Sequence, residues 1–327
     1  MLNIFVPAPH GLTRVELDQS SGVPRIPEDA VWIDLLEPTI EEEKLVEASL
    51  RIDVPTREEM KEIETSNRLY EDNGALYMTA TIAAQLDTDR PVSMAVTFIL
   101  AGNRLVTNRY LDTKPFQQFI AYAGKHPAAC QNAVTILAGL VEAFTERIAD
   151  VLERVGGDLD NVSGSIFARH GNGTPTSRDL RAMIERIGFN GELNSKARES
   201  LVSMGRLLMF VQQSMSGIST EQRDRFHSTS RDVISLSDHA SFLGSKVSFL
   251  LEATLGLINV EQNNIIKIFS VAAVLFMPPT LIASIYGMNY HLLPDLPGKY
   301  SNFLFSIALM IGSMGVTYAL FKRRGWL

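Results

Sequence analysis

The stretch FMPPTLIASIYGMNYHLLPDLPGKY, residues 276–300, decides the architecture of this chain. In it, a long apolar run ends at a glycine and an asparagine instead of at a charged residue. Residues 268–290 contain no Asp, Glu, Lys or Arg, and a second uncharged run covers residues 300–321. At about 1.5 Å per helical residue, each run can cross a hydrocarbon layer of roughly 30 Å. Two buried core helices are the alternative interpretation, but soluble cores rarely lack charge over such lengths. The sequence therefore predicts an integral membrane protein with a large soluble part.

Basic residues beside the two runs predict the orientation in the membrane. Lys267 precedes the first run and three basic residues at 322–324 follow the second, whereas the connection carries only Asp295 and Lys299 as full charges. Because basic flanks stay on the cytoplasmic side, both ends of the chain are expected in the cytoplasm and the connection outside. The chain opens without the basic stretch, short apolar run and cleavage site of a secretory signal, so insertion is expected to depend on the two runs.

The composition of the 327 residues narrows the class of function. The formal net charge of -7 disfavours a nucleic-acid partner, which would need a basic face, and suits a protein that gathers cations. A single cysteine, Cys130, excludes an intramolecular disulfide and a cysteine-based zinc cluster. The histidines lack the i, i+4 spacing of a catalytic metal site, and no nucleophile motif is found. We therefore expect neither an enzyme nor a cofactor.

The soluble part divides near residue 131. Before it, β-branched and aromatic stretches separated by turn signals predict strands, and two segments that open with a threonine and have glutamate nearby predict helices. The expected strands are residues 3–7, 30–36, 75–86, 92–100 and 104–108, and the expected helices are residues 39–50 and 56–65. Residues 1–130 are thus predicted to form a cytoplasmic domain of α/β or α+β type, and we take α/β as the fold class.

Residues 131–267 carry apolar residues at helical spacing. Residues 131–169 and 177–215 predict a long antiparallel helical hairpin, and a third helix begins near residue 220 and continues without a convincing break into the first uncharged run. This stalk helix would join the cytoplasmic part to a transmembrane domain, residues 268–327. The expected parts of that domain are a first span at about 268–287, an external loop at about 288–301, a second span at about 302–321 and a basic cytoplasmic tail.

The polar residues of the first span fall on one stripe. Successive helical residues turn by about 100°, so positions three, four and seven apart share a face. The stripe contains Asn263, Ile266, Ser270, Met277, Thr280, Ser284 and Met288. Packing of Ser and Thr against a neighbouring helix is the alternative, as we expect for Ser306, Ser313 and Thr317 in the second span. If the stripe lines a pore, several copies must surround one axis, because two spans cannot enclose a water-filled path.

Several segments of the chain together resemble a known family. The tripeptide Gly287-Met288-Asn289 follows an Ile-Tyr pair, is preceded by FMPPT and is followed by Pro-Asp-Leu. The segments VWIDL, REEM, INVEQN and FKRRGWL, at residues 31–35, 57–60, 258–263 and 321–327, fit the same pattern. These residues are similar to the CorA magnesium and cobalt transporter family. The resemblance implies a funnel-shaped homopentamer in the bacterial inner membrane, in contact with membrane lipid, that conducts Mg²⁺ and Co²⁺, with Ni²⁺ as a further substrate.

The resemblance also implies a selectivity filter at Gly287, Met288 and Asn289. Mg²⁺ dehydrates reluctantly, so neutral amide oxygens that accept hydrogen bonds from its water shell can select the hydrated ion. A ring of carboxylates would attract the ion more strongly but would hinder its departure. The external loop contributes the acid Asp295.

Further along the same path, the resemblance implies polar contacts for the hydrated ion and an apolar constriction that excludes water when closed. Asn263 and Thr280 would be the polar contacts, and Ile266, Phe269 and Met277 the constriction. The complete set of pore-lining candidates is Asn263, Ile266, Phe269, Ser270, Met277, Thr280 and Ser284. The membrane potential would drive the cations inward.

Gating by the transported ion is the control that the resemblance implies, so Mg²⁺ would be both substrate and regulatory ligand. Carboxylates at subunit boundaries would bind internal Mg²⁺, hold the pore closed and repel one another when the ion leaves. Glu252 matches such a position, and Asp232 and Asp238 are further candidates. A solvated or ion-paired stalk acid is the alternative for each of them.

Two other functions stay open at this point. A zinc-transporting relative would share the architecture, although a changed tripeptide or loop would favour it. A membrane-tethered metal sensor that transports nothing would need the cytoplasmic acids but not the polar stripe. Cation flux into liposomes separates these alternatives.

Overall fold

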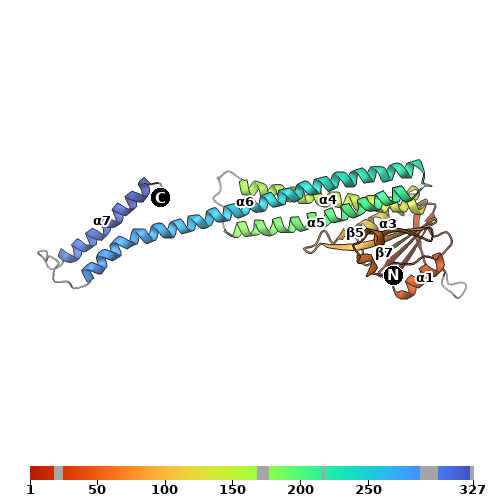
Figure 1. The fold of residues 1–327 in the computed structure, drawn as a ribbon, viewed down its shortest axis with the longest axis horizontal. Coiled ribbons are helices and arrows are strands. Elements are labelled where there is room, and N and C mark those ends of the chain that lie inside the picture. The colour runs from red at the N-terminus through yellow and green to blue at the C-terminus, as the bar shows by residue number, and fades with distance from the viewer. Residues whose placement is uncertain (18–24, 168–176, 216–217, 288–300, 325–327) are drawn as a thin grey trace. The chain divides into compact units, whose positions relative to one another are not determined.

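The computed structural model describes residues 1–17, 25–167, 177–215, 218–287 and 301–324 (Figure 1). It contains two compact units. The first comprises Met1–Asn172 and Ala182–Leu251, and the second comprises Gly173–Arg181 and Glu252–Leu327. The predicted domain boundaries after residues 130 and 267 stay predictions.

A seven-stranded sheet forms the centre of the N-terminal region. Its strands are β1 (Leu2–Ala8), β2 (Gly11–Val15), β3 (Trp32–Leu36), β4 (Leu69–Asp72), β5 (Ala75–Ala84), β6 (Val92–Ala101) and β7 (Arg104–Arg109). The strand order is β2-β1-β3-β7-β6-β5-β4. Among the described strands, β3 and β7 alone pair in parallel, with Asp34 opposite Thr107. This pairing joins the early and late strands of the sheet.

Helices cover the two faces of this sheet with separate apolar clusters. On one face, Trp32 stacks on Phe5 at a ring-centroid distance of 4.7 Å and contacts Phe116 and Phe119 of α3 (Lys114–Ala123). On the other face, Val46 of α1 (Ile40–Leu50) is buried in a cluster with residues such as Ile33 and Val106. Both faces of the sheet are buried, and the strands accordingly have nearly continuous runs of apolar residues in their sequences.

Three long helices complete the first unit. They are α4 (Ala133–Phe167), α5 (Ser177–Ser214) from Ala182 onward, and α6 (Thr220–Gly287) as far as Leu251. Polar side chains join them: the Asn194 side-chain amide donates to the Ala240 carbonyl at 2.9 Å, and the Arg225 guanidinium pairs with Glu142 at 2.6 Å. The predicted hairpin and third helix are therefore present, within a few residues of their expected ends.

The predicted helix at residues 56–65 is wrong. The structure has a single 3-10 turn, η1 (Glu59–Lys61), followed by a four-residue helix, α2 (Thr65–Arg68). Within this segment Met60 is buried, but Ile63 is 90% exposed, so no apolar stripe is available to hold a longer helix against the sheet. The prediction also lacked β2, β4 and α3. These short elements become stable only through their neighbours in the sheet or beneath it.

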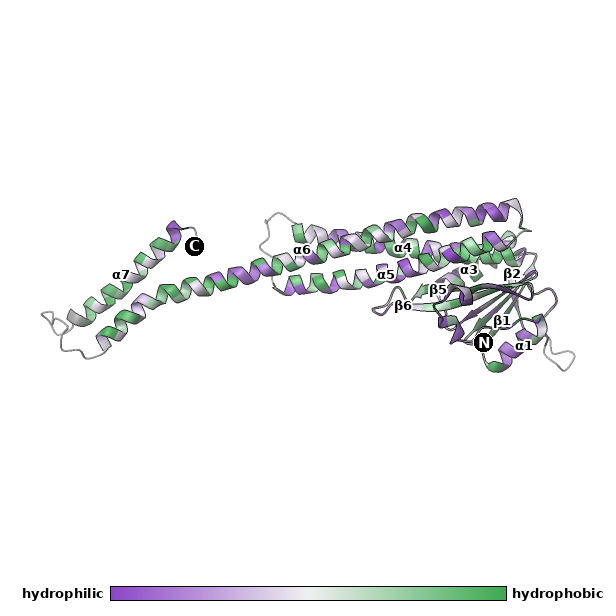
Figure 2. Ribbon diagram, in the orientation of Figure 1, coloured by the Kyte–Doolittle hydropathy of each residue, from purple (hydrophilic) through white to green (hydrophobic). Residues whose placement is uncertain are grey.

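The second unit contains the first residues of α5, the remainder of α6, and α7 (Ser301–Arg323). Both helices include windows that are long and apolar enough to cross a membrane, with mean hydropathy of 2.0 in α6 and 1.8 in Phe303–Arg323. In Figure 2 the final part of α6 and most of α7 are coloured as hydrophobic. These windows are 0% and 6% buried within the chain, which separates them from the core helices of a soluble protein.

Candidate functional site

The candidate pore residues form an exposed stripe on the last part of α6. Ile266, Phe269 and Met277 are 61%, 71% and 65% exposed, although all three are large and apolar. The four polar candidates on the same helix are exposed as well: Asn263, Ser270, Thr280 and Ser284. Exposure is not confined to this stripe, since Ile268 on another side of the helix is 67% exposed, whereas Val271 is 7% exposed. The stripe is therefore available to line a path between copies of the chain.

Hydrogen-bond acceptors occur on α6 near Thr280. The Thr280 hydroxyl donates to the Phe276 carbonyl at 2.7 Å, so its proton is used within the helix and its oxygen lone pairs remain able to accept. Pro278 and Pro279 lie inside α6 and have no N–H, so the carbonyls four residues earlier lack their usual helical donor. Acceptors of this kind suit the water shell of a hydrated cation, whose outward groups are all O–H donors.

The hydroxyls of α7 serve their own helix. Ser306 Oγ donates to the Phe303 carbonyl and Ser313 Oγ to the Met310 carbonyl, both at 2.8 Å, and Thr317 Oγ1 donates to the Ser313 carbonyl at 2.9 Å. These three hydroxyls are less exposed than the polar candidates of α6. The hydroxyl-bearing pore candidates of α6 are therefore exposed in the single chain, whereas these three residues of α7 are buried or half-buried.

The predicted selectivity filter falls mainly outside the described residues. Gly287 is the last residue of α6, is exposed, and has a φ outside the left-handed region; a Cβ added there would meet nothing within 4 Å. Met288, Asn289 and the loop acid Asp295 lie outside the described residues. In the single chain, therefore, neither crowding nor backbone strain requires a glycine at position 287.

The three candidate regulatory acids do not come together in one chain. Asp232, Asp238 and Glu252 are exposed along α6, and their sequence separations of six and fourteen positions correspond to about 9 and 21 Å of helix at about 1.5 Å per residue. Among the described residues no three His, Cys, Asp or Glu side chains are placed to hold a metal ion. A site built from these acids would need a second copy of the chain.

A buried ion pair between β3 and β7 is the largest polar feature that sequence reasoning did not find. Arg109 Nε donates to Asp34 Oδ1 at 2.8 Å and Arg109 Nη2 to Asp34 Oδ2 at 2.9 Å, and the two side chains are 3% and 0% exposed. Thr107 and Asn3 also donate to the Asp34 carboxylate, at 2.8 and 3.1 Å. Burial opposes the charge on Arg109, but the hydrogen bonds and charge attraction of Asp34 and Asp112 together outweigh that effect and raise the pKa of Arg109.

This pair also fixes α3. The Arg109 Cζ atom lies 4.1 Å from the centre of the Phe116 ring, and Arg109 Nη1 donates to Asp112 at 2.7 Å. The sequence signal was available, since Asp34 is an acid within an apolar strand pattern, but it gives no hint of a partner so distant in the chain. The pair acts on the fold rather than on a ligand, because its hydrogen-bonding groups are occupied by neighbours.

A second charge cluster surrounds Asp87, just after β5. Its carboxylate pairs with Lys114 and Arg147, each at 2.5 Å, and with Arg154 at 2.8 Å. Hydrogen bonds from Arg154 and Lys114 lower the pKa of Asp87 far below its ordinary value. The cluster connects the end of β5 to α3 and α4, because Lys114 belongs to α3 and both arginines belong to α4.

Comparison with known proteins places these features in a family. A family model described as "CorA-like Mg2+ transporter protein" matches residues 27–323. This chain belongs to the CorA-like Mg²⁺ transporter family. The magnesium transport protein CorA of Salmonella typhimurium is 34% identical over 328 residues and covers 100% of both chains. The protein of the same name from Escherichia coli K12 is also 34% identical over 328 residues with full coverage, and that from Mannheimia succiniciproducens is 33% identical over 330 residues.

Solved structures of low sequence identity share the CorA-like fold. The CorA magnesium transporter from Methanocaldococcus jannaschii matches with a TM-score of 0.75 and 19% identity, over 100% of this chain and 99% of that chain. The full-length CmaX protein matches with a TM-score of 0.67 and 15% identity, over 99% and 97% of the two chains. The ZntB cytoplasmic domain from Vibrio parahaemolyticus has a TM-score of 0.58 and 8% identity, over 79% of this chain and 97% of that domain.

The family resemblance predicted from the sequence is confirmed. The fold is CorA-like, with an N-terminal α/β domain, long helices and two apolar C-terminal helices that fit two membrane spans. The CorA family consists of transporters and is not an enzyme family, in agreement with the absence of a catalytic motif from the sequence. The roles of individual residues stay predictions.

Proposed function

We propose that this CorA-family chain forms a homopentameric Mg²⁺ channel in the bacterial inner membrane, with both termini in the cytoplasm, and that the channel also passes Co²⁺ and Ni²⁺. Hydrated ions are selected at Gly287, Met288 and Asn289 and enter under the membrane potential. The observation that carries the proposal is the exposed stripe of α6, on which an amide and hydroxyls alternate with large apolar side chains and which has no charged residue from position 268 to the end of the helix.

The alternation on this stripe suits conduction of a hydrated cation. Neutral oxygens at Asn263 and Thr280 accept hydrogen bonds from bound water without holding the ion as a carboxylate would. Ile266, Phe269 and Met277 lie between them and can exclude water when the apolar side chains approach the axis. The same stripe thus supplies contacts for passage and a constriction for closure.

Exposed apolar residues on the cytoplasmic part of α6 support assembly with further copies. Ile234, Phe242 and Phe249 are 59%, 61% and 56% exposed, and their spacing of eight and seven residues places them on one side of the helix. A repeated exposed apolar face is characteristic of an interface. Identical copies around one axis would cover this face and enclose the stripe at the same time.

Internal Mg²⁺ is proposed to gate the channel through acids of neighbouring copies. Asp232, Asp238 and Glu252 are exposed, and a single chain does not assemble them into a site. Mg²⁺ bound between copies would screen the repulsion among their carboxylates and stabilise the closed assembly. Loss of the ion would restore the repulsion and favour opening.

Flux measurements test the proposal. The full-length protein is reconstituted in liposomes that contain a Mg²⁺-sensitive dye, and influx is compared for wild type, Asn289→Ala, Asn263→Ala and Asn264→Ala. Asn264 is the matched control, because it has the same side chain and is exposed but lies about 100° around α6 from Asn263. We expect Asn289→Ala and Asn263→Ala to reduce influx by about fivefold or more, as for a loss of about 1 kcal/mol per hydrogen bond, and Asn264→Ala to leave it unchanged.

Other outcomes distinguish the alternatives. Equal effects of Asn263→Ala and Asn264→Ala would contradict the pore assignment of the stripe. Absence of any cation flux in wild type would favour a membrane-tethered sensor, and influx of Zn²⁺ in preference to Mg²⁺ would favour a zinc-transporting relative.

A further inference from the structure

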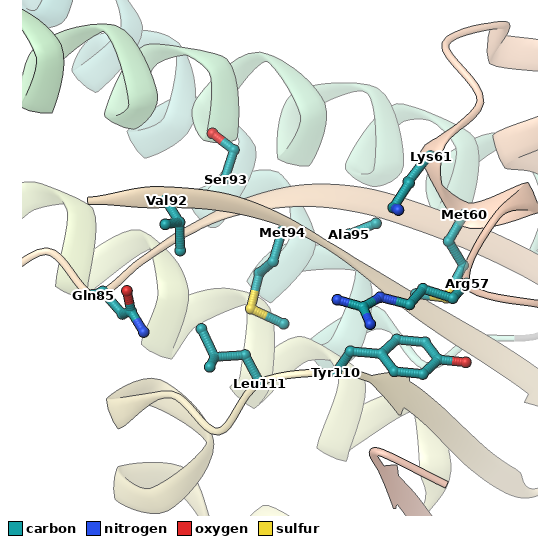
Figure 3. Close-up of a pocket in the computed structure, with 10 residues that line it drawn as sticks. All are labelled: Arg57, Met60, Lys61, Gln85, Val92, Ser93, Met94, Ala95, Tyr110 and Leu111. Atoms are coloured by element: carbon teal, nitrogen blue, oxygen red, sulfur yellow. The ribbon is translucent and has the colours of Figure 1, made fainter. Parts of the chain in front are cut away.

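A pocket in the N-terminal α/β domain has no part in the transport pathway proposed above. Its volume is about 330 Å³, within the range of small-molecule sites, and it lies between the η1 segment, the start of β6 and the residues that follow β7 (Figure 3). All of its lining residues belong to the first compact unit.

The charges of this pocket are opposite to those of the whole chain. The chain has a net charge of -7, yet the charged residues that line the pocket are Arg57 and Lys61, and no Asp or Glu lines it. Among the residues that the structure describes, neither cation forms an ion pair. The Arg57 Cζ atom instead lies 5.1 Å from the centre of the Tyr110 ring. In Figure 3 the Arg57 guanidinium points toward the end of the Met94 side chain, and the Lys61 ammonium lies beside Ala95.

Acids near the pocket are directed to other partners. The Glu59 carboxylate accepts from the Thr56 backbone N–H and hydroxyl, both at 2.8 Å, and the Glu62 carboxylate accepts from the Asn67 side-chain amide at 2.5 Å. The Tyr110 hydroxyl donates to Glu43 at 3.4 Å, on the side away from the pocket. The two cations therefore face the pocket without a neighbouring carboxylate to neutralise them.

The opposite wall of the pocket is apolar. Val92 and Met94 of β6 and Leu111 after β7 surround the space that the cations face (Figure 3). A methionine side chain adapts readily to the face of a flat ring. An arginine and a lysine together match the two negative charges of a phosphate monoester, and the arginine can bind two of its oxygens at once.

We propose that this pocket binds a small organic anion that consists of a flat apolar ring bearing a phosphate group. The phosphate lies between Arg57 and Lys61, and the ring lies against Met94 and Leu111. Arg57 and Lys61 are exposed, so water solvates them in the empty pocket. A ligand with both a phosphate and a ring would use the two charges and the apolar wall together, whereas inorganic phosphate would leave the apolar wall exposed to water.

Binding of phenyl phosphate to the full-length, detergent-solubilised protein tests this proposal. Saturation-transfer NMR on the ring protons reports binding directly and does not depend on transport. We expect saturable binding of phenyl phosphate, binding of phenol that is at least about tenfold weaker, and a comparable loss of phenyl phosphate affinity in Arg57→Gln and in Lys61→Gln. Arg51→Gln is the matched control, because Arg51 is exposed and lies outside the pocket, so its affinity should equal that of wild type.

A second variant separates the apolar wall from the charges. Met94→Ala should weaken phenyl phosphate binding but leave competition by inorganic phosphate unchanged. The proposal is overturned if wild type does not bind phenyl phosphate, if phenol binds equally well, or if Arg57→Gln and Lys61→Gln bind like Arg51→Gln. The proposal is also overturned if phenyl phosphate binds only after the assembly dissociates. In that case an acidic side chain of a neighbouring copy would occupy the pocket in the assembled protein. Mg²⁺ influx through the Arg57→Gln variant should equal that of wild type. Failure of the binding test would therefore leave the channel proposal unaffected.

Discussion

At the scale of single residues, Asp34 and Arg109 determine how the sheet holds together. An acid inside an apolar strand pattern is visible in the sequence, but its partner is 75 residues away, and no local periodicity connects the two. The parallel pairing of β3 and β7 is what brings the two side chains together. Local patterns therefore predicted β3 and β7 but not the polar contact that joins them.

Removal of the acid from this pair should be strongly destabilising. Asp34→Asn leaves the buried Arg109 charge without its main partner, and we expect a loss of about 3 kcal/mol in the free energy of unfolding. Thermal unfolding followed by Trp32 fluorescence in a Trp326→Phe background measures it, because the chain contains two tryptophans and Trp32 is fully buried.

Asp112→Asn is the control for this substitution. Asp112 also pairs with Arg109, but its side chain is 43% exposed, so the loss should be below about 1 kcal/mol. Equal destabilisation by the two substitutions would show that burial of the Asp34 pair does not matter.

Asp87 predicts a pH dependence with a definite sign. Its pKa is lowered in the folded protein, so its contribution to stability is present above the ordinary pKa of Asp, about 3.9, and is lost as the pH falls toward the lowered value. The difference in melting temperature between wild type and Asp87→Asn should therefore be largest near pH 6 and shrink below about pH 4. Asp89→Asn, at an exposed position two residues later, should show no such trend. A difference that grows on acidification would contradict this assignment.

At the scale of elements, two nearly identical caps lead to different structures. Thr39 and Glu42 form a capping box at the start of the eleven-residue α1. Thr56 and Glu59 make similar bonds, with the Thr56 N–H donating to Glu59 at 2.8 Å and the Glu59 N–H donating to Thr56 at 3.4 Å, yet only the three-residue turn η1 follows. The caps were predictable from sequence spacing. The length of each helix was not, because it depends on whether the sheet offers an apolar surface to cover.

The role of the α6 stripe is tested at Thr280. Thr280→Val keeps the shape of the side chain but removes the oxygen that can accept from a hydrated ion, whereas Thr280→Ser retains it. We expect Mg²⁺ influx in liposomes to fall about fivefold in Thr280→Val, as for one hydrogen bond of about 1 kcal/mol, and to recover in Thr280→Ser.

Thr317→Val on α7 is the matched control, since that hydroxyl also donates to its own helix, at 2.9 Å. Influx should be unchanged by this substitution. If Thr317→Val reduced influx as much as Thr280→Val, helix packing rather than ion contact would explain both effects.

At the scale of the whole molecule, the apolar face of α6 formed by Ile234, Phe242 and Phe249 is exposed in the single chain, and we propose that further copies cover it. The two membrane helices and the family were predictable from the sequence, because charge-free runs and the Gly-Met-Asn segment are local features. The number of copies was not, since it depends on the angle at which identical surfaces meet. A regulatory metal site formed by the candidate acids could not be predicted either, because its ligands would come from different copies and have no fixed spacing in one sequence.

A charge placed on this face should weaken the assembly. In Phe242→Glu, every copy would carry a carboxylate where an apolar contact is proposed, so like charges would gather around the axis. Light scattering of the detergent-solubilised protein should then give a mass below that of wild type, above all after Mg²⁺ is removed. Ile63→Glu is the control, because Ile63 is 90% exposed on the α/β domain and its substitution should leave the mass unchanged. An unaltered mass for Phe242→Glu would remove this face from the interface.

The parallel contact between β3 and β7 has a consequence for biosynthesis. While the ribosome is still translating, the first strands emerge with Asp34 hydrated, and its counter-ion appears only when the segment up to Arg109 has left the exit tunnel. Closure of such a distant loop is slow compared with hairpin formation. The Asp34 carboxylate can therefore leave water for its final position only after β7 has been made and has paired with β3.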